Sequence, residues 1–369
     1  MSKIKVLFAD HTPFVGGAQL RLAEDISFLD KKKFEAAVVI EKDSAFSALY
    51  ERLSVPIFKI SFPKLKLISP VALTRFISSV KEFQNLIIKI SPNVVVANTT
   101  RTLIVAGLAK RLFGLQFHLI SYIRDYDYPK WIFRLIKKQV NKYLFVSVSV
   151  QNYYRLPGEV IYLGSDIESK YKNITNQEIL RIKKSFNITE SDFVIGFIGR
   201  LVNWKGAMQL VKSFKQSEIK NAKLILWGTG DKQAGSIESD LKKYVLDHQL
   251  KDKVIFAGHT IHPEIAFKIM NCFVLSSVKA EPFATTVIEA ALAKVPIIAT
   301  NTGGTSEFIR HQKNGLLINP DDTNQLTQAL IRLMKDLSAA QKMADQAYQD
   351  ANEFREKVFI QKLEKYLMI

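Results

Sequence analysis

Short apolar segments alternate with longer segments of helical period along the whole chain. Several short segments are apolar at every position, which is typical of parallel strands covered by helices on both faces. This pattern predicts two consecutive series of alternating strands and helices. The predicted strands are 5–10, 34–40, 55–60, 94–98, 117–123, 144–149 and 159–164 in the first series, and 193–199, 223–228, 254–258, 272–277, 296–300 and 315–319 in the second.

A polar connection at 165–192, with no strand pattern, separates the two series. From Asp321 onward the chain reads as helical to its end. Two such series predict two doubly wound, Rossmann-like α/β domains, residues 1–165 and 166–349, with the natural active site in the cleft between them. The length of 369 residues fits two domains.

Cysteine usage and hydropathy narrow the cellular location. The single cysteine, Cys272, excludes an internal disulfide and fits a reducing compartment. The first residues lack the apolar core of a signal peptide, and no run reaches 18 apolar residues. We therefore expect a cytoplasmic protein. The histidines show no zinc spacing, and Asp125 with Asp127 is too weak a signal to predict a metal.

The net charge of +17 is concentrated in one region. Residues 51–150 contain 16 basic and 4 acidic residues. Such an excess indicates an anionic partner, which would be a lipid surface, a charged substrate or nucleic acid. A generally lysine-rich proteome is the alternative explanation. Because no nucleic-acid-binding motif is recognisable, we expect no nucleic acid partner.

One segment of this basic region has the composition of a membrane-surface helix. Residues 129–145 begin with Pro129, contain Trp131 and five cationic residues, and include no acidic residue. We predict a cationic amphipathic helix resting on an anionic lipid surface. Packing of its apolar side on the sheet explains the apolar residues equally well, but not the cations.

Loops that leave the carboxyl ends of parallel strands form the binding crevice of such domains. Gly16 and Gly17 follow the first strand and open a helix, where they either admit an anionic ligand or form a simple turn. Arg200 and Lys205 follow strand 193–199. Two cations beside a helix N-terminus suit a diphosphate leaving group, although solvated surface cations give the same pattern.

The segment after strand 272–277 contains two carboxylates eight residues apart. Glu281 is predicted in a loop, and Glu289 in the helix that begins near Thr285, so both are suited to sugar hydroxyls. Glu289 would otherwise belong to a partly buried ion pair. Thr285 and Thr286 would offer hydroxyls and backbone N–H groups to phosphate.

Together these segments resemble the retaining glycosyltransferases of family 4, which have the GT-B fold. The resemblance lies in VGGAQ (15–19), YLGSD (162–166), GRLVNWKG (199–206), EPFATTVIE (281–289), TNTGGTSEFI (300–309) and NGLLINPDD (314–322). It implies that the two domains face each other, the first binding the acceptor and the second the donor. It further implies that the C-terminal helix, 350–369, joins the first domain.

The resemblance also implies roles for the residues that match. Arg200 and Lys205 would bind the donor diphosphate, Glu281 the hydroxyls of the sugar, and Glu289 those of the ribose. The residues implied to line the donor are Phe283, Ala284, Thr285, Thr286, Gly16 and Gly17.

Two positions depart from the family pattern. Ala284 replaces a usual Gly, which would narrow the sugar pocket, and Arg124 with Asp125 stands where many members have His-Asp. We take Arg124 and Asp125 as acceptor-side candidates.

The implied reaction moves a sugar from a nucleoside-diphosphate sugar to a hydroxyl, with retention and without metal or cofactor. We expect UDP-sugar rather than GDP-sugar, a glycan or glycolipid acceptor, and a role in cell-surface polysaccharide or glycolipid synthesis. We expect the enzyme in the cytoplasm or peripherally at the inner face of the cell membrane. The alternatives are a nucleotide-sugar 2-epimerase of the same fold and a non-catalytic basic protein that binds membranes or nucleic acid.

Overall fold

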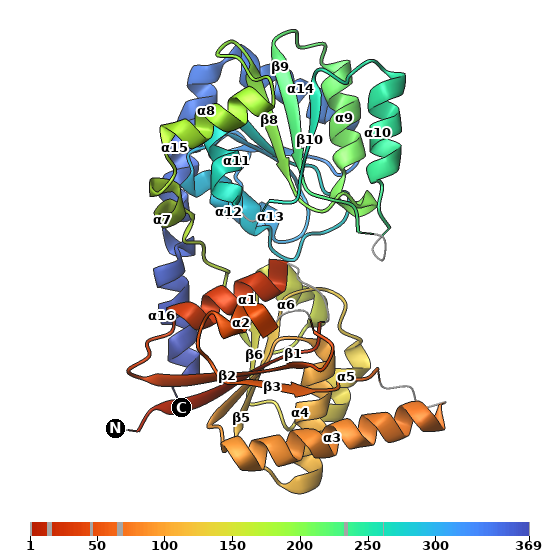
Figure 1. The fold of residues 1–369 in the computed structure, drawn as a ribbon, viewed down its shortest axis with the longest axis vertical. Coiled ribbons are helices and arrows are strands. Elements are labelled where there is room, and N and C mark those ends of the chain that lie inside the picture. The colour runs from red at the N-terminus through yellow and green to blue at the C-terminus, as the bar shows by residue number, and fades with distance from the viewer. Residues whose placement is uncertain are drawn as a thin grey trace. The chain divides into compact units, whose positions relative to one another are not determined.

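The structure, a computed structural model, describes residues 2–12, 17–44, 47–64, 69–231, 235–260 and 262–368. The chain forms two compact units, which are residues 1–162 with 356–369, and residues 163–355. Figure 1 shows the elements of both. The changes of unit fall at 162/163 and 355/356, where we expected them at 165/166 and 349/350.

The described residues of the first unit contain one parallel sheet in the order β3-β2-β1-β4-β5-β6-β7. Helices α1 and α2 lie on one side of this sheet and α3 and α4 on the other (Figure 1). The strands are β1 (Ile4–Asp10), β2 (Phe34–Glu41), β3 (Ile57–Ile60), β4 (Val94–Ala97), β5 (His118–Ile123), β6 (Lys142–Phe145) and β7 (Glu159–Val160). The helices are α1 (Gly17–Phe28), α2 (Ser47–Glu51), α3 (Pro70–Ile90), α4 (Thr100–Phe113), α5 (Lys130–Ile136), α6 (Val148–Tyr154) and α16 (Glu356–Leu367).

The described residues of the second unit also contain one parallel sheet, in the order β10-β9-β8-β11-β12-β13. Its strands are β8 (Phe193–Ile198), β9 (Ala222–Trp227), β10 (Val254–Gly258), β11 (Cys272–Leu275), β12 (Ile297–Thr300) and β13 (Leu316–Ile318). Its helices are α7 (Ile167–Lys172), α8 (Asn176–Ser185), η1 (Asn203–Lys205), α9 (Ala207–Gln216), α10 (Glu238–Asp247), α11 (Pro263–Ile269), α12 (Thr285–Leu292), α13 (Thr305–Phe308), α14 (Thr323–Lys335), α15 (Leu337–Asp350) and η2 (Ala351–Phe354).

The apolar strands explain this architecture. All four residues of β4 are buried, and so are all four of β11. A strand that buries both faces needs helices on both sides of its sheet. In the second unit, Leu210 of α9 and Leu330 of α14 pack with Leu224 of β9 in one core. The predicted fold class, two Rossmann-like parallel sheets, is therefore correct.

Three predicted elements near β6 have the wrong extent, of which one is the strand predicted at 159–164, observed only as Glu159–Val160. The expected strand 144–149 ends at Phe145, because Ser147 caps α6 by accepting a hydrogen bond from the Val150 amide. The expected helix 129–145 is the short α5, Lys130–Ile136. Asn141 exchanges hydrogen bonds with the backbone of Leu119 on β5, and so draws the chain into β6.

Ion pairs mark the place where the chain returns to the first unit. Arg355 pairs with Glu168 of α7 in the second unit. The next residue, Glu356, pairs with Arg21 of α1 in the first unit. Helix α16 then buries Phe359, Leu363 and its neighbours against that unit. These two pairings fall on either side of the change of unit between residues 355 and 356.

Candidate active site

The donor-side candidates lie in two segments that follow neighbouring strands of the second unit. Strands β8 and β11 pair in parallel, with Cys272 opposite Ile195, so their carboxyl ends lie side by side. Gly206, at the end of the first segment, has φ +70°, and a Cβ there would lie 1.8 Å from the carbonyl oxygen of Ser276. The Ser276 hydroxyl donates to the Gly206 carbonyl at 2.9 Å. Only glycine permits this contact between the two segments.

This contact brings Lys205 to Glu281. The Lys205 Nζ lies 2.5 Å from Oε1 of Glu281, and the Ser277 hydroxyl donates to the same oxygen, also at 2.5 Å. We call Lys205, Ser277 and Glu281 the Glu281 cluster. Glu281 is only 4% exposed, so its carboxylate requires such partners. Because both donors bind Oε1, the other carboxylate oxygen is left for a further donor.

The backbone of Glu281 is fixed by a second close approach. The Gly304 amide donates to the Glu281 carbonyl at 2.8 Å. Gly303 has φ +60°, and a Cβ there would lie 2.1 Å from the same carbonyl oxygen. In the sheet, β11 lies between β8 and β12. The Glu281 loop, which follows β11, is therefore held on one side by the loop after β8 and on the other by the Gly303–Gly304 turn after β12.

Arg200 belongs to the same loop but has a different partner. Its Nη1 lies 3.1 Å from Oδ2 of Asp231, and its side chain is 53% exposed. Both cations of the loop lie near the Trp204 ring, whose centre is 4.4 Å from the Lys205 Nζ and 6.0 Å from the Arg200 Cζ. The structure thus joins Lys205 to Glu281 and leaves Arg200 at the surface.

The remaining donor-side candidates lie in or just before α12. Thr285 and Thr286 are in its first turn, and Glu289 follows at helical spacing on the same side. Ala284, the N-cap residue, supplies no side-chain cap, so the first N–H groups of the helix remain for another acceptor. The Phe283 ring stacks on Phe354, with 5.8 Å between ring centres, so this ring also packs against the 351–354 segment.

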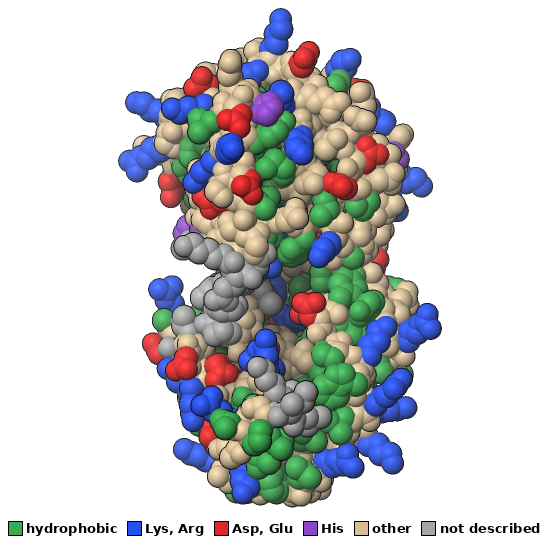
Figure 2. All heavy atoms as spheres, turned by 90° about the vertical axis from the view of Figure 1, so that its right-hand side faces the viewer, with side chains coloured by type: hydrophobic (Ala, Val, Ile, Leu, Met, Phe, Trp, Pro, Cys, Tyr) green, Lys and Arg blue, Asp and Glu red, His purple; other side chains and the backbone are tan. Residues whose placement is uncertain are grey.

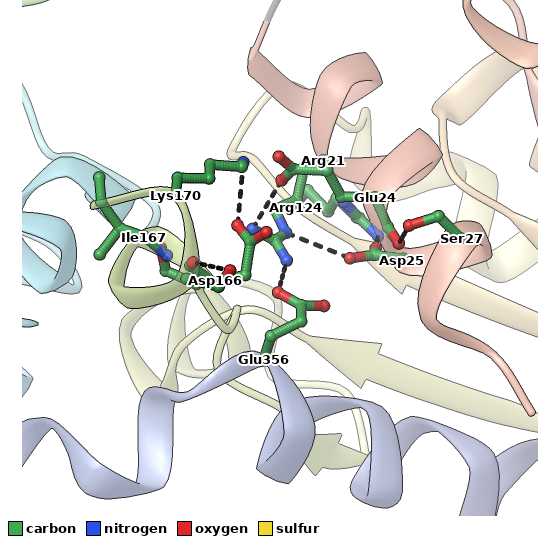
Figure 3. A network of polar contacts seen from close by, with 11 residues as sticks. Arg21, Glu24, Asp25, Ser27, Arg124, Asp166, Ile167, Lys170 and Glu356 are labelled. Carbon is green, nitrogen blue, oxygen red and sulfur yellow. Dashed lines mark hydrogen bonds and ion pairs between the residues drawn. The ribbon is translucent and has the colours of Figure 1, made fainter. Parts of the chain in front are cut away.

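The acceptor-side candidates lie in the first unit, where Arg124 follows β5. Arg124 donates to Asp25 of α1 at 2.7 Å, and Arg21 joins Asp25 to Glu356 of α16 (Figure 3). Burial opposes the charge of Arg124, but the Asp25 carboxylate outweighs it and holds the pKa of Arg124 above its ordinary value. Arg124 is therefore a member of a buried ion-pair network that fastens α1 and α16.

Asp125 has a different environment from Arg124. Its Oδ1 accepts a hydrogen bond from the Asp127 amide at 2.8 Å. Burial raises the pKa of Asp125 to about 6, although that hydrogen bond acts in the opposite direction. A carboxyl group with this pKa exchanges its proton near neutral pH, as a general acid or base requires.

The other glycines of the prediction lie at the start of α1. Gly17 is the first residue of that helix. Gly16 lies outside the described residues.

The sequence analysis missed three residues that contact the candidate site. Ser277 contacts Glu281, Asp231 contacts Arg200, and Trp204 contacts both cations. The position of Ser277 was the available signal, because it ends the predicted strand 272–277 and precedes Glu281 by four residues. Nothing in the sequence relates Asp231 to Arg200, which is 31 residues away.

Two features are absent from the described residues. In that part of the chain, no three His, Cys, Asp or Glu side chains are grouped as metal ligands would be. None of the helices there is both long and apolar enough to cross a membrane.

Comparisons with known proteins agree with this arrangement. A family model described as glycosyl transferases group 1 matches residues 178–350. An uncharacterized glycosyltransferase of Methanocaldococcus jannaschii is 28% identical over 202 residues, which cover 53% of this chain and 49% of that protein. The capsular polysaccharide biosynthesis glycosyltransferase CapM of Staphylococcus aureus is 30% identical over 158 residues, which cover 42% of this chain and 40% of CapM. The chain thus spans no more than about half the length of these relatives.

Solved structures extend the likeness to the whole chain. The crystal structure of HepE from Anabaena, in complex with UDP and glucose, has a TM-score of 0.83 and 21% sequence identity, and the match covers 99% of each chain. At this identity the likeness shows the fold, which is GT-B, as the sequence motifs implied. The family match contains both segments of the Glu281 cluster. Residues 178–350 thus match the group 1 glycosyl transferases, and the whole chain has the GT-B fold.

Proposed function

We propose that this chain transfers a hexose from a UDP-sugar to a hydroxyl acceptor, with retention at the anomeric carbon. The observation that carries the proposal is the Glu281 cluster, in which a cation and a buried carboxylate meet at the carboxyl ends of β8 and β11. Lys205 and Arg200 would stabilise the diphosphate as its bond to the sugar breaks. The second oxygen of Glu281 would accept a hydrogen bond from a sugar hydroxyl.

Helix α12 would hold the rest of the donor. Its first N–H groups, which lack a side-chain cap, would face phosphate oxygens, and Glu289 would bind the ribose hydroxyls. We propose uracil as the base because the similar HepE structure contains UDP. The reaction would use no metal or other cofactor, since Arg200 and Lys205 supply positive charge at the leaving group.

We propose a glycan or glycolipid as the acceptor, in the synthesis of a cell-surface polysaccharide or glycolipid. The likeness to CapM supports this class of product. The enzyme would work in the cytoplasm, at the inner face of the membrane where such acceptors are assembled. Asp125, with its raised pKa, would act on the acceptor side.

Product analysis separates this proposal from the alternatives. With a UDP-sugar and a hydroxyl acceptor, the proposal requires UDP and the glycosylated acceptor in equal amounts. A nucleotide-sugar 2-epimerase would instead change the sugar while leaving the nucleotide-sugar intact. A non-catalytic basic protein would leave all UDP-sugars unchanged, and either of these results would overturn the proposal.

Variants of the two cations test the assigned site. We expect Lys205→Ala and Arg200→Ala each to lower kcat/KM. The ratio to the unchanged enzyme should correspond to a loss of about 2–4 kcal/mol of transition-state stabilisation. Lys212→Ala is the matched control, because Lys212 is an exposed lysine of α9 outside the cluster. If a folded Lys205→Ala protein kept normal turnover, the diphosphate would have to bind elsewhere.

A further inference from the structure

One outer face of the first unit combines exposed apolar side chains with cations. In the described part of the chain, thirteen large apolar side chains are exposed, and six of them lie on α3, α4 and α5. These are Val71, Ile77, Ile88, Leu112, Phe113 and Trp131. We call the exposed side chains of these three helices, with Lys137 and Lys138, the α3–α5 face.

The three helices form a continuous surface. The Arg111 guanidinium of α4 reaches the Leu135 carbonyl of α5 at 3.5 Å. Ile88 of α3 and Lys110 of α4 line the same hollow, which has a volume of about 560 Å³. Figure 2 views the right-hand side of Figure 1, and its lower part shows apolar side chains together with Lys and Arg.

The charge of this face has one sign over α4 and α5, whereas α3 contains one acidic residue, Glu82, which pairs with Lys42. Arg111, Arg134, Lys137 and Lys138 are all exposed. Between Glu82 and Glu159 the sequence contains only two acidic residues, which are Asp125 and Asp127. Both follow β5, at the carboxyl edge of the sheet, so neither α4 nor α5 contains an acidic residue.

We infer that the α3–α5 face docks on an anionic lipid bilayer. A soluble polyanion would satisfy the cations but would leave Leu112, Ile88 and Trp131 exposed, at 65%, 61% and 47%. A bilayer accommodates both kinds of side chain, because Lys and Arg reach the headgroups while Trp and aliphatic residues enter the boundary with the acyl chains. This inference concerns a surface that the proposed transfer reaction does not use.

The single lipid-binding helix predicted at residues 129–145 does not form. Helix α5 has only seven residues, and Ile132, Phe133 and Ile136 are buried against the unit. Its apolar side therefore packs on the protein, as a crossover helix does. The lipid-facing apolar groups come instead from the outer sides of α3 and α4 and from Trp131.

The test is cosedimentation of the full chain with vesicles of phosphatidylcholine, with and without phosphatidylglycerol. We expect binding only to the anionic vesicles, and weaker binding as salt rises. Lys137→Glu with Lys138→Glu should reduce the partition coefficient by at least about tenfold. Lys183→Glu with Lys184→Glu, an adjacent lysine pair on α8, is the matched control and should have little effect.

A second pair of variants separates a bilayer from a polyanion. Leu112→Ser with Trp131→Ser keeps every charge and should still reduce vesicle binding on the order of tenfold. Leu180→Ser with Leu246→Ser removes two equally exposed leucines of the second unit and should not. Unchanged binding of the first pair, or equal binding to neutral vesicles, would overturn the inference. UDP affinity, measured separately on each folded variant, reports on the proposed function alone.

Discussion

At the scale of single residues, Ser277 is the least expected member of the candidate site. It is fully buried and donates to the Glu281 oxygen that Lys205 also binds. We therefore consider Ser277 a positioning residue, which holds the carboxylate so that its other oxygen faces the sugar. Without the hydroxyl, Lys205 alone would orient Glu281, and the carboxylate would rotate more freely.

We expect Ser277→Ala to lower kcat/KM for the intact UDP-sugar. The loss should correspond to about 1–3 kcal/mol of transition-state stabilisation, the usual cost of losing a hydrogen bond to a buried charged group. Affinity for UDP alone should change little, because UDP lacks the sugar that Glu281 contacts. Ser213→Ala is the control, since that buried serine donates to the Thr323 carbonyl outside the site. An equal loss in UDP affinity would show that Ser277 supports the whole loop rather than the carboxylate.

Asp125 makes a prediction about pH at the same scale. The folded protein raises its pKa from 3.8 to about 6, mainly by burial. The folded state thus binds this proton more tightly than the unfolded chain does. The free energy of unfolding should fall as pH rises from about 4 to about 6, and stay lower above that range.

Asp125→Asn should remove this dependence and raise the free energy of unfolding at pH 7 by up to about 3 kcal/mol. The Asn oxygen can still accept the hydrogen bond from the Asp127 amide. Denaturant unfolding at pH 5 and pH 7 measures the difference. Asp127→Asn removes an exposed carboxylate nearby, and an equal gain from that variant would assign the effect to general charge instead.

At the scale of elements, one glycine decides how two loops meet. A Cβ on Gly206 would lie 1.8 Å from the Ser276 carbonyl oxygen, so the start of α9 would have to move away from the end of β11. Gly235 also has a positive φ, +79°, but a Cβ there would meet nothing within 4 Å. A side chain at either position would therefore strain the backbone, but only a side chain at Gly206 would also collide with the Ser276 carbonyl.

We expect Gly235→Ala to cost about 1 kcal/mol of stability, and Gly206→Ala to cost more and to abolish measurable transfer. Thermal unfolding and UDP release, measured on both variants, separate the two effects. Normal turnover of Gly206→Ala would mean that the contact between Lys205 and Glu281 tolerates a shift of the loop.

At the scale of the whole molecule, the two units should respond to different changes. The buried network of Arg21, Asp25, Arg124 and Glu356 lies entirely in the first unit. The proposed donor-binding residues Arg200, Lys205, Glu281 and Glu289 lie in the second. Removing one partner of a buried ion pair is costly because it leaves the other charge without compensation.

We expect calorimetry to resolve two transitions. Glu356→Gln should lower the free energy of unfolding of the first unit alone, by about 3 kcal/mol. UDP at 100 times its Kd should raise the free energy of unfolding of the second unit alone, by about 2.7 kcal/mol. Glu190→Gln, an exposed glutamate, is the control. A single transition that moves in both experiments would contradict independent unfolding of the units.

The sequence by itself determined the fold class and the family resemblance. Buried parallel strands are apolar at successive positions, and helices repeat their apolar residues every three or four positions, so both signals are local. The family resemblance was also visible in the sequence alone, because its motifs are short segments such as GRLVNWKG and EPFATTVIE. The family model that matches residues 178–350 confirms it there. The pattern also placed Glu281 in a loop and Glu289 in the following helix, as observed.

Only the tertiary structure decided which of these groups meet. Lys205 and Glu281 are 76 residues apart, and the pairing of β8 with β11 and the close contact at Gly206 bring them together. The end of α5 was decided by Asn141 pairing with Leu119 on a neighbouring strand. Arg124 was an acceptor-side candidate by sequence, but it belongs to a buried ion-pair network. The members of this network come from α1, from the loop after β5 and from α16. Such contacts depend on strand register and on residues distant in the chain, which local periodicity does not encode.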